Sequence, residues 1–325
     1  MNPADRTNLI DAVSAALANS GFSVSERCDM RPLCFDLIAG RDDSILVIKV
    51  LANADALDED AAQKMIKLAM SIKGAPIVVA MRTSTDALED DVVYLRSNVP
   101  VITFNTLSEY IINEQRPIAY AGPGGLYAEI DSKRLRELRE IHNLSLSSLA
   151  NMLGVSRRTI SMYESGMNML VEVAAQLEET FGGEFIRPLE VFSTGFMESS
   201  MRDAIRQIRS HISEDVCNDD EKYVIDSLVG MGCDVIHVKK APFDAIVQNA
   251  PANLNAIAGI GGADEASLRK ARMMKSIAEV ADVPPVMFSP FPGVRKMAGL
   301  PVISFSELEL ISAPEEILEL ILERS

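Results

Sequence analysis

The stretch LRELREIHNLSLSSLANMLGVSRRTISMYESG occupies residues 135–166 and predicts three short helices joined by tight turns. Leu135, Leu138 and Ile141 recur at i, i+3 and i+6, so we expect them to form the buried face of the first helix. An amphipathic helix of this kind needs partners that cover its apolar side. The residues that follow are therefore expected to fold back against it.

The two turns after that helix carry strong local signals. Ser145 precedes LSSLANML, where its hydroxyl group can accept from the first unpaired amides of a second helix. Gly154 follows that helix directly and suits a left-handed position that glycine adopts without strain. Ser156 then caps a third helix, predicted over residues 157–165. This order of caps and glycine is typical of a helix-turn-helix.

The third helix has one apolar and one polar face. Ile160 and Tyr163 are spaced i, i+3 and are predicted to point inward. The outer face is left with Arg157, Arg158, Thr159 and Met162. A basic, outward face at the start of such a helix indicates DNA binding. The structural alternative is an ordinary three-helix core whose two exposed arginines only favour solubility.

The pattern LRELRE…LSxxxLAxxLGVSRRTISxYESG resembles the helix-turn-helix of the Cro and lambda-repressor group. In that group the first residues of the third helix contact base edges in the major groove. Arginine pairs bidentately with guanine, so the two arginines are the strongest expected base contacts. With the two capping serines, the predicted DNA-binding residues are Arg157, Arg158, Thr159, Met162, Ser156 and Ser145.

The resemblance also implies a structural ion pair between the first and third helices. Arg139 and Glu164 occupy the positions that the group pairs. One position departs from the pattern: the group usually opens the second helix with a glutamine that holds a phosphate, and this chain has Leu146. One contact to the DNA backbone is therefore expected to be missing.

Charge separates this stretch from the rest of the chain. The 325 residues carry a net charge of −16, which disfavours nonspecific coating of nucleic acid. Residues 131–166 instead hold six Lys and Arg against four Asp and Glu, a net charge of +2. A small basic surface on acidic domains fits a site-specific regulator of double-stranded DNA.

The sequence gives no sign of a metal, a cofactor or a membrane segment. The four cysteines lack CxxC spacing, and the three histidines are scattered, so we expect no zinc site and free thiols. The N-terminus lacks the charge and apolar run of a signal peptide, and no segment has the length of a membrane span. We expect a cytoplasmic protein without a cofactor.

Strand-like and helix-like runs outside the helical stretch predict α/β domains. Before it come a helix, three strand-like runs, a helix and two further strands, the last of them followed by a short helix. The fold class is therefore α/β plus all-α, with two repeated α/β domains flanking a helical DNA-binding domain. The predicted domains are an α/β repeat at 1–115, a linker hairpin at 116–131, the helix-turn-helix domain at 132–183, a connector at 184–212, with a helix at 197–212, and a second α/β repeat at 213–325.

The repeat is visible as matches in the same order. Phe35-Asp36 reappears as Phe243-Asp244, and NVPVITF at 98–104 reappears as GLPVISF at 299–305. ILVIKVL at 45–51 aligns with LNAIAGI at 254–260, an offset of 209. The methionine-rich segment at 269–280 has helical spacing and is expected in the core or at an interface.

Each repeat also resembles the core of the PD-(D/E)xK nucleases, which hold a divalent cation with two carboxylates and orient water with a lysine. The first copy offers Asp36 and Lys49, but Val47 stands where the second acid belongs. In the second copy Asp244 remains, while Ala256 and Ala258 replace the acid and the lysine. We expect a degenerate fold without catalytic residues, in which Lys49 pairs with Asp36.

The whole arrangement resembles the HTH-type transcriptional regulatory proteins of archaea. The first hypothesis is a sequence-specific transcription regulator, not an enzyme, that binds double-stranded DNA as a homodimer because each chain has one helix-turn-helix. The alternative is a DNA-processing nuclease of PD-(D/E)xK type that the helix-turn-helix directs to its site. A protein-interaction scaffold is a third class, which Arg157 and Arg158 disfavour.

Overall fold

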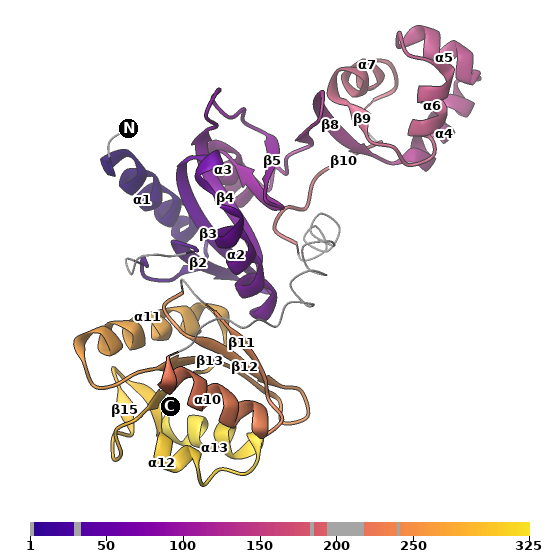
Figure 1. Cartoon of the computed structure of the whole chain (residues 1–325). Helices are drawn as coiled ribbons and strands as arrows, with labels where there is room; N and C mark the ends of the chain where they lie inside the picture. The colour runs from indigo at the N-terminus through magenta and orange to yellow at the C-terminus, as the bar shows by residue number, and fades with distance from the viewer. Residues whose placement is uncertain (1–2, 29–33, 183–184, 194–217, 239–240) are drawn as a thin grey trace.

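The structure, a computed structural model, describes residues 3–28, 34–182, 185–193, 218–238 and 241–325. Two α/β units lie against each other, and a helical domain projects from the first of them (Figure 1). None of the described helices is long and apolar enough to cross a membrane. The helix predicted at 197–212 lies outside the described residues, and the five domain boundaries stay a prediction.

The first α/β unit is a mixed sheet with helices on both faces. Its helices are α1 (Pro3–Asn19), α2 (Glu59–Ser71) and α3 (Phe104–Asn113), with a short 3-10 turn at Ala54–Ala56. Its strands are β1 (Ser23–Val24), β2 (Leu37–Arg41), β3 (Ser44–Asn53), β4 (Ala75–Arg82), β5 (Val92–Arg96) and β6 (Val99–Ile102). They are ordered β1-β2-β3-β4-β6-β5, with β3, β4 and β6 parallel. Helices α1 and α3 pack on one face and α2 on the other.

The second α/β unit has the same architecture. Its helices are α10 (Asp219–Gly230), α11 (Glu265–Ala281), α12 (Phe305–Leu308) and α13 (Pro314–Arg324). Its strands are β11 (Asp234–His237), β12 (Ala245–Asn249), β13 (Leu254–Ile260), β14 (Pro285–Ser289), β15 (Lys296–Met297) and β16 (Leu300–Ser304). The order β11-β12-β13-β14-β16-β15 reproduces that of the first unit strand for strand. The internal repeat predicted from the sequence is confirmed.

Strand pairing corrects the predicted alignment by one residue. Val47 of β3 lies opposite Pro76, and Ile257 of β13 lies opposite Pro285. The two prolines correspond, so the offset in this strand is 210 and not 209. The residue equivalent to Lys49 is therefore Gly259, and the predicted pair Ala256 and Ala258 was wrong.

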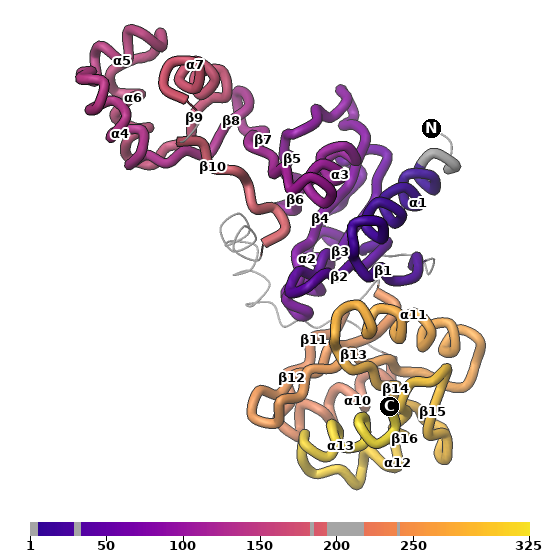
Figure 2. The backbone as a smooth tube through the Cα atoms, turned by 180° about the vertical axis from the view of Figure 1, so that it is seen from behind, coloured from indigo at the N-terminus to yellow at the C-terminus, as the bar shows by residue number. Residues whose placement is uncertain are grey.

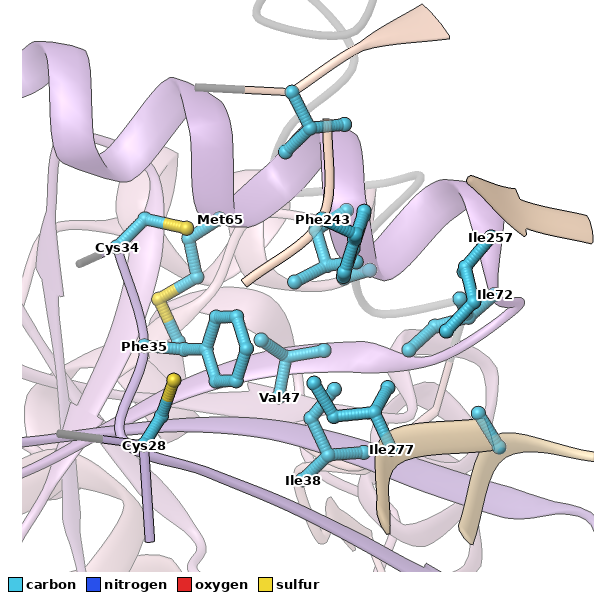
Figure 3. Close-up of a cluster of buried hydrophobic side chains, with 14 of the residues drawn as sticks. Cys28, Cys34, Phe35, Ile38, Val47, Met65, Ile72, Phe243, Ile257 and Ile277 are labelled. Carbon is cyan, nitrogen blue, oxygen red and sulfur yellow. The ribbon is translucent and has the colours of Figure 1, made fainter. Parts of the chain in front are cut away.

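The two units share one hydrophobic core, which we call the shared core. It contains buried side chains of α2 and of α11, together with the faces of both sheets on which these helices pack. Val47 and Ile257 each have 0% of their surface exposed and lie in this cluster (Figure 3). Met273 and Met274 of the methionine-rich segment lie there too, which places that segment in the core.

A glycine allows the closest contact between the units. A Cβ atom on Gly40 of β2 would lie 2.7 Å from the carbonyl oxygen of Val280 in α11. The backbone amide of Glu26 also donates to the hydroxyl group of Ser276 in α11 over 2.7 Å. Helix α11 thus packs against its own sheet and against β2 of the other unit (Figure 2).

The helical domain continues the first sheet. Residues 116–131, predicted as a hairpin, contain β7 (Ala119–Gly122) and β8 (Gly125–Ile130), which pair antiparallel. Strand β7 pairs with β5, a strand that the sequence did not predict. The domain also contains α4 (Ser132–Ile141), α5 (Leu146–Met152), α6 (Arg157–Tyr163), α7 (Val171–Phe181), β9 (Met169–Leu170) and β10 (Ile186–Arg187).

The chain leaving this domain docks on the first unit. Leu189 and Val191 are buried with the α1 and α3 face of the sheet. The ring of Phe192 stacks on Tyr110 of α3, with the ring centroids 4.0 Å apart. Both ends of the helical domain are therefore anchored to the first unit.

We predict that Gly40→Ala loosens the contact between the two units. The added methyl group would overlap the Val280 carbonyl group, and overpacking of this kind costs about 1–3 kcal/mol. Urea unfolding of both variants would measure the change. Gly230→Ala is the matched control, because nothing lies within 4 Å of its added Cβ atom and it should not destabilise the chain. Equal unfolding midpoints would contradict the prediction.

Candidate DNA-binding surface

Both predicted serine caps hold the helices of the motif. The Ser145 hydroxyl oxygen accepts from the Ser148 amide at the start of α5, and the Ser156 hydroxyl oxygen accepts from the Thr159 amide at the start of α6, both over 3.0 Å. Gly154 between them has a φ of 64°. The local signals in the sequence therefore identified this turn correctly.

A small core fixes α6 beneath its outer face. Ile160 and Tyr163 are buried against Leu135 and Leu138 of α4, as predicted. Ile141 was predicted in the same buried face but is 64% exposed. It is the last residue of α4, and at i+6 it has rotated away from the face that Leu135 and Leu138 define.

Glu164 at the end of α6 is held by two arginines of α4. Arg139 Nε donates to Glu164 Oε1 over 2.5 Å, which confirms the predicted pair. Arg136 donates to the same carboxylate over 3.3 Å and to the Glu164 carbonyl oxygen over 3.2 Å. Hydrogen bonding by Glu164 raises the pKa of Arg139. The sequence analysis missed Arg136, although its i, i+3 spacing from Arg139 places both side chains on one face.

The opposite side of α6 presents the residues predicted to contact DNA. Arg157 and Arg158 are exposed, Met162 is 42% exposed and Thr159 is half-buried. Within the described part of the chain, no ion pair involves either arginine, so both charges remain available for a ligand. Helix α6 ends at Tyr163, two residues earlier than predicted.

In the first repeat, Asp36 belongs to a closed network that we call the Asp36 cluster (Arg6, Asp36 and Val50). Arg6 of α1 donates to Asp36 Oδ1 over 2.5 Å and to the Val50 carbonyl oxygen over 2.7 Å. The Val50 amide donates to Asp36 Oδ2 over 2.8 Å. Arg6 is a cation on this carboxylate that the sequence did not predict, and the Asp36 charge also acts on Lys49.

The second repeat contains the same arrangement in the Asp244 cluster (Asp244, Ile260 and Lys270). Lys270 Nζ lies 2.9 and 2.7 Å from the two carboxylate oxygens and 3.0 Å from the Ile260 carbonyl oxygen. The Ile260 amide donates to Asp244 Oδ2 over 2.6 Å. Here the cation comes from α11, whereas in the first repeat it comes from α1. The sequence carried no local signal for either partner.

Lys49 is also buried. It is 9% exposed, and burial lowers its pKa while the Asp36 carboxylate acts in the opposite direction. Val47, two residues earlier on the same face of β3, lies in the shared core. Among the described residues, no group of three or more His, Cys, Asp and Glu side chains could hold a metal ion.

Two family models match separate parts of the chain. A PD-(D/E)XK superfamily domain matches residues 6–117, and a helix-turn-helix matches residues 135–185. These matches agree with the fold class of α/β repeats combined with a helical domain. No solved structure matches the chain.

Relatives cover nearly the whole length. A protein of Methanocella arvoryzae is 38% identical over 322 residues, 98% of this chain and 97% of the relative. Proteins of Halobacterium salinarum and Archaeoglobus fulgidus are 36% and 33% identical, each covering 98% of both chains. All three carry the name "Putative HTH-type transcriptional regulatory protein". The chain belongs to this family. In this member of the HTH-type regulatory proteins, the matched helix-turn-helix includes all of α4 to α7 apart from the first turn of α4.

We predict that Glu164→Ala destabilises the chain by roughly 3 kcal/mol, because it leaves Arg139, with a side chain only 13% exposed, without its carboxylate. Thermal or urea unfolding measures the loss. Glu178→Ala is the control and should change stability little, because Glu178 is an exposed residue of α7. If the two variants unfold together, the Glu164 network contributes nothing to stability.

Proposed function

We propose that this chain is a sequence-specific transcription regulator that inserts α6 into the major groove of double-stranded DNA. The observation that carries the proposal is the two-sided character of α6. Ile160 and Tyr163 anchor it in the core, while Arg157 and Arg158 extend from its first turn without an ion-pair partner in the described residues. A helix held in this way presents rigid donors to base edges.

The other predicted contacts have separate roles. Thr159 and Met162 lie on the same outer face and would contact bases or a thymine methyl group. The oxygens of Ser145 and Ser156 cap helices, and each hydroxyl group also shares a hydrogen bond with a second one, of Ser148 or Thr159, over 2.8 Å. One hydroxyl hydrogen of each pair is therefore left to donate to a phosphate oxygen. Phosphate contacts fix the register, and the arginines supply the discrimination between sequences.

We predict that Arg157→Ala and Arg158→Ala each weaken binding to a selected operator by about 1–3 kcal/mol without changing stability, because both side chains face solvent. Fluorescence anisotropy on operator and scrambled duplexes measures the loss. Ile160→Ala provides the contrast: it should lower stability by roughly 2–4 kcal/mol through a cavity in the core. Arginine variants that bind the operator as tightly as the parent would refute this use of α6.

One helix-turn-helix offers few base contacts, so we propose that two chains bind a two-fold symmetric site. Each chain contributes one α6, and the half-sites lie about 34 Å apart, one turn of DNA. A cytoplasmic location is part of the same proposal, since the operator lies on the genome.

Sedimentation of the free protein and of its operator complex tests the dimer. We predict two chains per palindromic duplex, and an affinity that collapses when half a turn of DNA is inserted between half-sites. The insertion rotates the second half-site to the opposite side of the duplex. A single chain that binds one half-site as tightly as the full operator would exclude this arrangement.

We further propose that neither repeat is a nuclease. A hydrolytic centre must bind a hard cation through several oxygens. In the Asp36 cluster and the Asp244 cluster, each carboxylate already accepts from an amide and a cationic side chain. The positions of the second acid hold Val47 and Ile257, both buried in the shared core.

Incubation of the purified protein with duplex, single-stranded and branched DNA in magnesium or manganese tests this second proposal. We predict no cleavage in any combination. The Arg157→Ala, Arg158→Ala double variant shows whether any cutting depends on α6. Cleavage that disappears in Asp36→Ala, with folding retained by circular dichroism, would show that the first repeat is an enzyme.

A further inference from the structure

An open surface pocket of about 520 Å³, which we call the cavity, lies between the β7–β8 hairpin and α6. Tyr120 and Tyr127 of the hairpin line one side, and Thr159 and Tyr163 of α6 line another. Asn168, from the turn before β9, completes the polar part of the wall. This volume is within the range of small-molecule sites.

The β7–β8 hairpin holds the rings of Tyr120 and Tyr127 in fixed positions at the cavity. The ring centroids of Tyr120 and Tyr127 lie 5.8 Å apart, with the planes inclined by 26°. Gly122 permits this, because a Cβ atom there would lie 2.9 Å from the Tyr127 ring. The Tyr127 hydroxyl group donates to the Pro123 carbonyl oxygen over 2.8 Å, and the Asn168 side-chain amide donates to the Tyr120 hydroxyl group over 2.7 Å. The rings are therefore fixed before any ligand arrives.

The chemistry of the wall selects the ligand. The half-buried rings of Tyr120 and Tyr127 offer faces for stacking, and the amide and hydroxyl groups offer neutral hydrogen bonds. None of the residues that line the cavity carries a charge, so an ionic ligand would lose its hydration without gaining a partner. A flat, uncharged ring with donors and acceptors on its edge satisfies both the rings and the polar groups.

We propose that this cavity binds a neutral planar heteroaromatic molecule of nucleobase size and that the bound molecule competes with DNA. Competition follows from Thr159, which lines the cavity, is half-buried and directly follows the exposed Arg157 and Arg158. This second part rests on the proposed use of α6 for DNA, whereas ligand binding itself does not.

Binding is tested on the full chain without DNA. The six tyrosines can be replaced by 3-fluorotyrosine, and their fluorine resonances assigned with single Tyr→Phe variants. Adenine, thymine and caffeine at millimolar concentration are the probes. At least one should shift the resonances of Tyr120, Tyr127 and Tyr163 and leave those of Tyr94, Tyr110 and Tyr223 unchanged. No shift with any probe, or equal shifts at all six positions, would overturn the site.

Two variants distinguish binding of the probe in the cavity from nonspecific binding elsewhere on the protein. Tyr127→Leu removes one stacking face and should weaken the bound probe about tenfold. Tyr223→Leu is the matched control, because Tyr223 also belongs to an aromatic pair, with Phe305 at 5.0 Å, but lies in the second repeat. Equal affinities in the two variants would mean that the probe binds elsewhere.

The competition is measured by titrating the operator with protein at saturating probe. We expect weaker operator binding, and by linkage an equal weakening of the probe when DNA is bound. Unchanged operator affinity at saturating probe would refute the competition while leaving the site intact. If the protein binds no DNA, the proposed function is refuted but the ligand site is not, because the fluorine NMR experiment is done without DNA.

Discussion

The shared core between the two repeats is the constraint on which the rest of the structure depends. Each repeat uses the face of its sheet that carries α2 or α11 to pack against the other. In a PD-(D/E)xK fold the second metal-binding acid belongs to that face, at the positions of Val47 and Ile257. A carboxylate there would be buried among apolar side chains at large cost. If neither repeat is a nuclease, as proposed, the packing of the repeats against each other accounts for the apolar residues at these two positions.

Both repeats keep the first carboxylate, Asp36 or Asp244, because nearby donors can hydrogen-bond to it. Asp36 and Asp244 each accept from the backbone amide of the neighbouring central strand and from one cation that also binds that strand's carbonyl oxygen. The cations come from non-equivalent helices, α1 and α11. The two repeats thus form the same network with cations from different helices, which indicates that neutralising the aspartate matters more than the identity of its partner.

How far the sequence predicts the structure depends on how local each signal is. The capping serines, Gly154 and the spacing of Ile160 and Tyr163 act within one or two turns of helix, and they gave the helix-turn-helix correctly. The register of β13, the existence of β5 and the partners Arg6 and Lys270 depend on strands and helices far away in the chain. The spacing of apolar residues carries no information about such contacts. It therefore could not show that β13 aligns with β3 at an offset of 210 and not 209.

The position of the helical domain gives the acidic charge of the chain a role in specificity. The domain projects from the repeats and is fixed at both ends, by β7 pairing with β5 and by Leu189 and Val191 in the first core (Figure 1). Residues 131–166 carry a charge of +2 on a chain of net charge −16. Charges further away than a Debye length of about 10 Å are screened, so DNA near the helical domain responds mainly to that domain's own charge. They do repel DNA that approaches them directly, which supports the proposal that α6 makes the contact.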